Sequence, residues 1–100
     1  ITSVAAFGHT PGHTLFRMDS EGQSFAYVAD ITNVPSLFAR APDWSVLFDM
    51  NPAMARVSRR RVFDMLVKDK MMAGGFHFPF PAFGTMEASG NGYQFKPVAA

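Results

Sequence analysis

The sequence predicts an α/β (α+β) fold with one mainly antiparallel sheet and one long helix. Two turn signals and one helix signal carry this prediction. Ser20-Glu21-Gly22-Gln23 and Ser89-Gly90-Asn91-Gly92 each separate two short runs with the composition of strands, which is typical of hairpins. Asn51-Pro52 combines a helix-capping residue with a proline in the first turn, and a helical pattern follows it to about Lys70.

The first half of the chain is expected to form three strands and two short elements. Strands are predicted at residues 1–7, 14–19 and 24–29, and the second and third should pair as a hairpin. Pro35 suits the first position of a short helix that continues to Ala39. Residues 44–48 are predicted to form a further short strand.

The long helix should pack one apolar face against the sheet. Its spacing predicts a buried stripe made of Met54, Val57, Val62, Met65 and Leu66. Arg61 falls inside that stripe, so the pattern is imperfect. Lys68 and Lys70 lie in the last predicted turn, where a positive charge complements the helix dipole.

The last part of the chain is expected to return to the sheet. A glycine-rich strand is predicted at residues 71–77, followed by an aromatic, proline-punctuated loop at 78–84. Residues 85–88 and 93–95 should then form the second hairpin.

Composition narrows the classes of function. Hydrophobic residues make up 48% of the 100 residues and charged residues 17%, which is typical of a folded domain. No apolar run approaches the roughly 20 residues that cross a membrane, and a net charge of +1 gives no field to attract nucleic acid. The chain has no cysteine, so any metal must be bound through nitrogen and oxygen.

Three potential metal ligands each lie at the end of a predicted strand or of the turn that follows it. His13 ends the turn His9-Thr10-Pro11-Gly12-His13-Thr14, Asp30 follows Tyr27-Val28-Ala29, and His77 follows Ala73-Gly74-Gly75-Phe76. Neutral imidazole suits zinc, and the Pro-Gly turn makes a restricted mount for it. This placement suggests one metal-binding rim, although manganese, iron and cobalt also accept such ligands.

The strings HTPGHT, AD, GGFH, GFHFPFPAFG and SGNGYQFKPV carry a resemblance to a known family. They resemble the second half of the metallo-β-lactamase superfamily, in the branch that contains methyl parathion hydrolase and the lactonases. The resemblance implies half of a four-layer αββα sandwich. The family's first half carries a His-x-His-x-Asp-His cluster, which is absent here because the only three histidines of the chain are His9, His13 and His77. Residues 1–100 are therefore expected to be a single C-terminal half-domain.

The resemblance also implies a role for each candidate residue. His13 would bind one zinc ion, His77 would bind the second, and Asp30 would bridge both and act in catalysis, with a hydroxide between the metals as nucleophile. The family more often has glycine where this chain has Ala29. His9 does not align with a ligand and is expected to support the ligands or the loop.

Each of these assignments has a simpler alternative. His13 could be a turn histidine, Asp30 a capping residue, and His77 a half-buried histidine bonded to a backbone carbonyl. Phe78, Phe80 and Phe83 could line a pocket for an apolar or aromatic substrate, or they could be core residues. The run Arg59-Arg60-Arg61 is expected to be a solvated helix face rather than a nucleic-acid site.

The sequence therefore favours part of a zinc-dependent hydrolase that acts on a lactone, an ester or a phosphotriester. With part of the ligand set absent, the chain alone is expected to be inactive. The alternative is a non-catalytic fragment that forms a homodimer, in which a second copy replaces the missing N-terminal half. No nucleic-acid or membrane partner is expected. A soluble protein of bacterial type is expected, in the cytoplasm or the periplasm.

Overall fold

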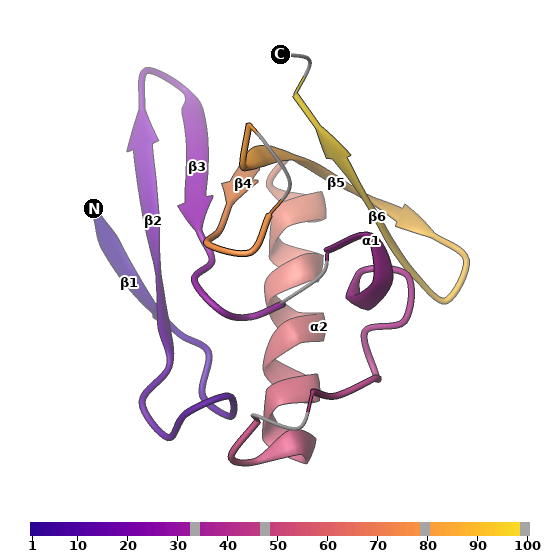
Figure 1. Cartoon of the computed structure of the whole chain (residues 1–100). Helices are drawn as coiled ribbons and strands as arrows, with labels where there is room; N and C mark the ends of the chain where they lie inside the picture. The colour runs from indigo at the N-terminus through magenta and orange to yellow at the C-terminus, as the bar shows by residue number, and fades with distance from the viewer. Residues whose placement is uncertain (33–34, 47–48, 79–80, 99–100) are drawn as a thin grey trace.

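The computed structural model describes residues 1–32, 35–46, 49–78 and 81–98 (Figure 1). The elements are, in chain order, β1 (Thr2–Ala5), β2 (Thr14–Ser20), β3 (Gln23–Tyr27), α1 (Pro35–Phe38), α2 (Pro52–Lys68), β4 (Met72–Gly74), β5 (Phe83–Ser89) and β6 (Gly92–Pro97). The strands form one sheet in chain order, and each neighbouring pair is antiparallel except β3/β4, which is parallel. The predicted sheet with one long helix is confirmed.

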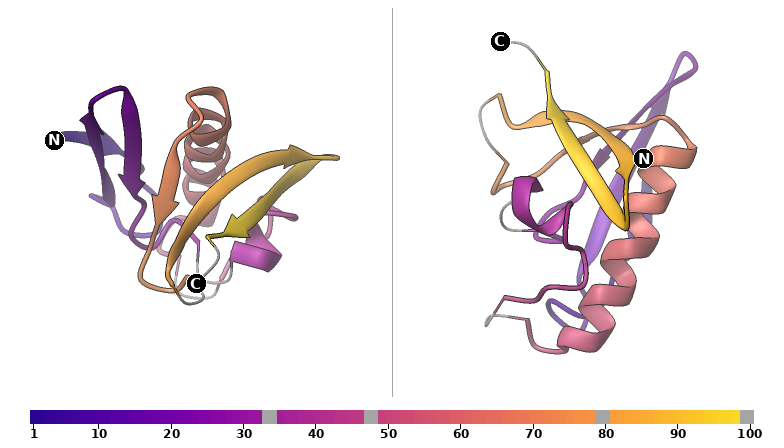
Figure 2. Two further views of the ribbon diagram at one scale, coloured as in Figure 1. Left: turned by 90° about the horizontal axis from the view of Figure 1, so that it is seen from above. Right: turned by 90° about the vertical axis from the view of Figure 1, so that its right-hand side faces the viewer.

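The parallel pair exists because the chain leaves the sheet after β3 and returns through both helices, which is the connection that parallel neighbours require. Helix α2 runs along one face of the sheet, and α1 lies beside β6 (Figures 1 and 2). The core between α2 and the sheet contains Leu15, Ala26, Val28, Val62, Phe63, Leu66, Met86, Tyr93 and Phe95. None of the helices in the described part of the chain is long and apolar enough to cross a membrane.

Helix α2 begins as the sequence predicts and ends slightly earlier. The side chain of Asn51 accepts a hydrogen bond from the amide of Met54 at 3.1 Å, which satisfies one of the free N–H groups of the first turn. The helix ends at Lys68, and Lys70 takes a left-handed conformation with φ 52°. The amide of Met71 then bonds to the carbonyl of Leu66 at 3.0 Å and closes the last turn.

The buried face of α2 is rotated from the predicted stripe. Val62 and Leu66 are buried as expected, but Met54 and Val57 are 45% and 69% exposed, so that part of the prediction was wrong. The buried positions are Ala55, Ser58, Arg59, Val62, Phe63 and Leu66. Ser58 and Arg59 can lie on this face because they donate hydrogen bonds to the backbone carbonyls of Phe7 and Ile31. A pattern of hydrophobic residues does not reveal such hydrogen bonds.

Arg59 corrects two further predictions. It is 3% exposed rather than solvated, and its guanidinium donates to the carbonyls of Ile31, Pro42 and Trp44 at 2.7–2.8 Å. Residues 44–46 form no strand, because their backbone groups bond in turns and to this guanidinium instead of to a neighbouring strand. Residues 47–48 of that predicted strand lie outside the described residues.

The second face of the sheet is not covered by either helix. Side chains alternate along each strand, and the registers of β2, β3, β4 and β5 place six apolar side chains on this face: Phe16, Met18, Phe25, Tyr27, Met72 and Phe83. We call this set the open face. Phe16, Tyr27 and Phe83 are 44%, 39% and 36% exposed, which is a large apolar surface for so small a chain.

Candidate functional site

The antiparallel register of β2 and β3 brings His13 to Asp30. Phe16 pairs with Tyr27, and continuing this register past the strand ends places His13 opposite Asp30. The contact is present: the amide of Asp30 donates to Nε2 of His13 at 3.1 Å. The register of β1 and β2 continues in the same way, so that Nδ1 of His13 lies 3.0 Å from the carbonyl oxygen of Ala6.

The parallel register of β3 and β4 brings His77 to the same place. Tyr27 pairs with Gly74, and Asp30 and His77 each lie three residues beyond these partners. Nε2 of His77 is 3.2 Å from Oδ1 of Asp30, and both side chains are 39% exposed. The three residues therefore lie together, because the carboxyl ends of two parallel strands meet at one edge of the sheet. That they bind a metal stays a prediction.

Small residues let the two loops approach each other. The predicted strand at 71–77 ends at Gly74, since the chain turns there with the amide of Phe78 bonded to the carbonyl of Gly75 at 3.3 Å. A Cβ at Gly75 would lie 3.1 Å from the carbonyl oxygen of Ala29 and 2.9 Å from the ring of Phe78. Any larger residue at position 75 would push the Phe78 ring or the Ala29 carbonyl aside where the His77 loop passes the Asp30 loop.

The turn that carries His9 and His13 is attached to the start of α2. The carbonyls of Gly8 and His9 accept hydrogen bonds from the amides of Asn51 and Met50 at 2.8 and 3.0 Å. Gly8 has φ 138°, and a Cβ there would overlap the backbone of Ala55. These contacts position the histidine turn from the helix side, while β1 and β2 position it from the sheet side.

His9 is the fourth polar member of the site. Its Nε2 lies 3.7 Å from Oδ2 of Asp30, and its ring meets that of His13 edge-on with centroids 5.7 Å apart. On its other side, Nδ1 lies 2.9 Å from Oδ1 of Asp49, whose side chain is 1% exposed. His9 was expected to support the ligands or the loop, and its own partner is Asp49.

Asp49 and Arg59 are the residues that sequence reasoning missed. Nη2 of Arg59 lies 3.6 Å from Oδ2 of Asp49, and both side chains are almost fully buried. Burial lowers the pKa of Arg59 from its ordinary value, and the charge of Asp49 opposes that shift. The pair depends on a contact between residue 49 and helix α2 that no local pattern encodes, and Arg59 looks like one of several helix-surface arginines.

The nitrogen and oxygen atoms of His13, Asp30 and His77 are of the types that bind zinc. Imidazole nitrogens and carboxylate oxygens are the ligands that zinc accepts in proteins without cysteine. Within the described ranges, however, no three His, Asp or Glu side chains are arranged to enclose an ion. The Nε2 lone pair of His13 is also engaged by the Asp30 amide. The residues present thus fit part of a metal site and do not form a complete one.

The aromatic residues near His77 divide between core and surface. Phe78 is 7% exposed and packs against Phe95 with ring centroids 4.8 Å apart, so its placement favours the core alternative over a pocket role. Phe83 is 36% exposed on the open face, and Phe76 is 78% exposed beside the His77 ring. Phe80 lies outside the described residues.

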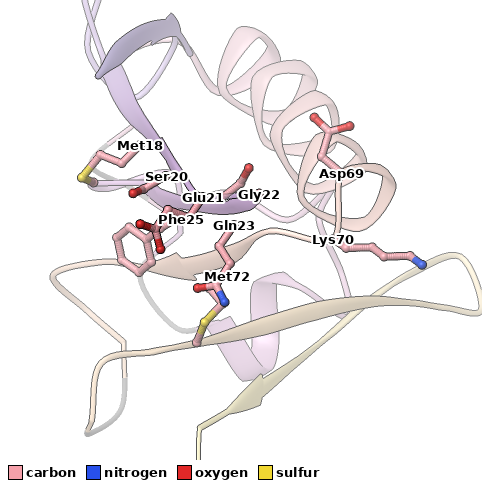
Figure 3. Close-up of a pocket in the computed structure, with 10 residues that line it drawn as sticks. Met18, Ser20, Glu21, Gly22, Gln23, Phe25, Asp69, Lys70 and Met72 are labelled. Carbon is pink, nitrogen blue, oxygen red and sulfur yellow. The ribbon is translucent and has the colours of Figure 1, made fainter.

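A cleft of about 710 Å³ lies at the other end of the strands (Figure 3). It is bounded by the tip of the β2–β3 hairpin, the end of α2 and the start of β4, and its lining includes Met18, Phe25, Asp69 and Met72. None of the residues that line it belongs to the histidine rim. The cleft is therefore a feature of the open face and not the candidate site.

Comparison with solved structures gives close matches to the whole fold. One is AidC, a dizinc quorum-quenching lactonase in complex with the product N-hexnoyl-L-homoserine, at 28% identity and a TM-score of 0.93; the match covers 98% of this chain and 33% of that chain. A second is the hydrolase AbOPH of the β-lactamase superfamily, at 26% identity and a TM-score of 0.93, covering 98% and 34%. The chain is similar to part of a metallo-β-lactamase superfamily hydrolase.

The chain spans about a third of the length of the solved structures that it matches. A third match, a probable metal-dependent hydrolase from Staphylococcus aureus, has 17% identity and a TM-score of 0.74, covers 98% of this chain and 36% of that one, and shows the shared fold alone. No family model and no curated protein matches the sequence. The predicted resemblance is confirmed by the structural neighbours. The predicted half of a four-layer αββα sandwich is confirmed as to fold, and the matched share of those chains is about a third.

Proposed function

We propose that this chain is one part of a zinc-dependent hydrolase whose substrate is a lactone, an ester or a phosphotriester. The observation that carries the proposal is the meeting of His13, Asp30 and His77 at one edge of the sheet, although they come from three separate loops. A dizinc lactonase among the structural neighbours supports zinc as the metal.

Each residue has a stated task in this proposal. His77 would offer an imidazole nitrogen and Asp30 its carboxylate oxygens. His13 would offer Nε2 only after that nitrogen exchanged its hydrogen bond from the Asp30 amide for the metal. Bound zinc supplies Lewis acidity that polarises a carbonyl or phosphoryl oxygen and ionises water near neutral pH. The half-exposed side chains of Asp30 and His77 leave the rim open to a substrate, and Phe83 and Phe76 offer apolar contact nearby.

The described rim offers too few donors for a two-metal site. We infer that the remaining ligands come from a His-x-His-x-Asp-His segment in a longer protein, whose sheet covers the open face. The chain by itself is then inactive. A nucleic-acid substrate is not proposed, since Arg59 is buried and Arg60 is paired with Asp43 at 2.8 Å.

The proposal is tested in the protein that carries this chain together with its upstream segment. Asp30→Asn and His13→Ala should each lower the hydrolysis of a lactone or phosphotriester by more than about 100-fold, since loss of a ligand should exceed the 10–100-fold cost of losing a ligand's partner. Zinc content, measured by inductively coupled plasma mass spectrometry, should fall in parallel.

Asp19→Asn is the matched control, because Asp19 is also a carboxylate at a strand end but pairs with Arg17 on the surface. It should leave activity and zinc content unchanged. Full activity and full zinc content in both site variants would show that these residues are not ligands.

A second candidate function is a non-catalytic homodimer, and the open face is the observation that favours it. Apolar side chains that a longer protein would cover are exposed in this chain. A second copy could cover them through a two-fold contact, in which the same surface serves both partners. In such a dimer the rim would hold zinc weakly or not at all.

A further inference from the structure

A buried carboxylate lies directly behind His9. The Asp49 side chain is 1% exposed, and its Oδ1 lies 2.9 Å from Nδ1 of His9. A buried carboxylate is costly unless it is paired with a donor or a positive charge. Since Oδ1 of a carboxylate can only accept, Nδ1 of His9 must carry the hydrogen in this contact.

Arg59 holds this carboxylate from the other side. Its Nη2 lies 3.6 Å from Oδ2 of Asp49, an oxygen that has no hydrogen-bond partner among the described residues. Arg59 is itself anchored, because its other guanidinium nitrogens donate to three backbone carbonyls. The pair is therefore held between α2 and the loops that it packs on, and Asp49 is not free to turn away from His9.

We propose that Asp49, which Arg59 holds in place, is a positioning residue for the site. It accepts a hydrogen bond from Nδ1–H of His9 and so keeps the hydrogen of the neutral ring on Nδ1. Nε2 of His9 then presents a lone pair, rather than an N–H, to the carboxylate of Asp30. Nε2 lies 3.7 Å from Oδ2 of Asp30, which is beyond hydrogen-bond length. Two acceptors thus face each other across this gap.

The consequence concerns Asp30. With the opposite tautomer, Nε2–H of His9 would point at Oδ2 of Asp30 and would form a hydrogen bond with it after a small movement. That bond would engage the oxygen that His77 leaves free, since His77 contacts Oδ1. By fixing the tautomer of His9, Asp49 therefore leaves Oδ2 of Asp30 available to a cation. The lone pair on Nε2 of His9 lies beside that oxygen.

That Oδ2 of Asp30 binds zinc rests on the proposed function. The tautomer of His9 does not depend on that function. The test therefore reads the tautomer directly, in the 100-residue chain without metal or substrate. The chain has three histidines, so long-range ¹H–¹⁵N correlation spectra of a ¹⁵N-labelled sample, at a pH at which all three imidazoles are neutral, separate their ring nitrogens. We expect His9 in the Nδ1–H form.

Asp49→Asn should reverse the tautomer of His9. Arg59 donates hydrogen bonds and cannot accept them, so the amide oxygen of the new side chain will face Arg59 and its NH₂ group will face His9. Nδ1 must then become the acceptor, and the ring ¹⁵N shifts of Nδ1 and Nε2 should exchange. In the Asp49→Asn/Arg59→Met variant nothing selects the amide orientation, so the Nδ1–H form should return at least in part.

Two controls accompany this experiment. Asp43→Asn changes a carboxylate that pairs with Arg60, the neighbouring arginine of α2, and should leave His9 unchanged. His13 is an internal control, because its Nδ1 faces the carbonyl of Ala6 in every variant.

The wild-type spectrum alone can overturn the proposal, since an Nε2–H form of His9 contradicts it whether or not the variants fold. An unchanged Nδ1–H form in folded Asp49→Asn would also contradict it. The two proposals can fail separately. If His9 has the expected tautomers but the longer protein binds no zinc, this inference stands and the proposed function is rejected.

Discussion

Ala29 has an unusual backbone conformation next to the candidate site. It lies directly before Asp30 and has φ 50°, a left-handed conformation that costs an L-residue with a Cβ roughly 1–2 kcal/mol. The tight passage of Gly75 against the carbonyl of Ala29 explains why the loop turns there. The resemblance implies that glycine is more common at this position, and the left-handed backbone conformation of Ala29 gives the physical reason.

Replacing Ala29 with glycine should therefore stabilise the fold. We expect Ala29→Gly to raise the free energy of unfolding by about 1 kcal/mol, which corresponds to roughly 4–8 °C in the melting temperature of a domain of this size. Ala88→Gly is the matched control, because Ala88 is an exposed strand residue without positive φ, and glycine there should destabilise by about 0.5–1 kcal/mol. Thermal unfolding followed by circular dichroism measures both, and a destabilising Ala29→Gly would show that the left-handed conformation is not strained.

At the same scale, the identities of the candidate ligands were predictable and their partners were not. His13, Asp30 and His77 stand out because each follows a strand pattern, and strand ends at one sheet edge lie close together. Asp49 and Arg59 depend on a contact between a loop and a helix that no local pattern encodes. Whether the three predicted residues bind zinc stays a prediction.

Among the elements, helix α2 and the histidine turn act as one unit. Residues 8–9 bond through their carbonyls to the start of the helix, and Ser58 of the helix donates to the carbonyl of Phe7 at 2.6 Å. The helix thus positions the turn that carries His9 and His13, as well as covering the sheet.

The two glycines of this turn region should respond very differently to alanine. Gly8→Ala introduces a Cβ against the backbone of Ala55 at a φ that disfavours L-residues, so we expect a loss of about 1–3 kcal/mol or more. Gly12→Ala meets nothing within 4 Å and has no positive φ, so its effect should stay within about 0.5 kcal/mol. Urea unfolding of the two variants gives the comparison, and equal losses would show that the turn does not pack on α2 in this way.

The elements themselves were predicted unevenly, for a physical reason. Hairpins and the capped start of α2 depend on residues that are adjacent in sequence, and both were confirmed. The predicted strand at 44–48 failed because residues 44–46 bond in turns and to Arg59. The face of α2 was misjudged because Met54 and Val57 are apolar but point away from the core, where they are 45% and 69% exposed.

The whole molecule presents one covered and one open sheet face. Helix α2 covers one face of the sheet (Figure 2), and the core lies beneath it. The other face carries the apolar side chains of the open face, of which Phe16, Tyr27 and Phe83 are exposed. This asymmetry agrees with the comparison, in which the chain matches about a third of each related structure. A longer protein, or a second copy of this chain, could cover the open face.

The isolated chain should therefore self-associate through the open face. We expect native mass spectrometry to show a dimer, and Phe16→Lys to weaken it at least tenfold in Kd, about 1.4 kcal/mol, because a charge would be buried in the contact. Val57→Lys is the control, since Val57 is 69% exposed on α2, on the other side of the sheet. A monomeric wild-type chain at micromolar concentration would reject the homodimer as an alternative function.

The sequence by itself determined the local features: where turns fall, where α2 begins, and which residue types can bind a metal. These follow from backbone preferences and side-chain chemistry within a few residues. Only the tertiary structure decided which side chains meet. The parallel register of β3 and β4 brings Asp30 to His77, the antiparallel register of β2 and β3 brings it to His13, and the packing of α2 places Arg59 behind Asp49 and His9. Such contacts depend on how distant segments align, and their energies come from burial that a linear pattern does not specify.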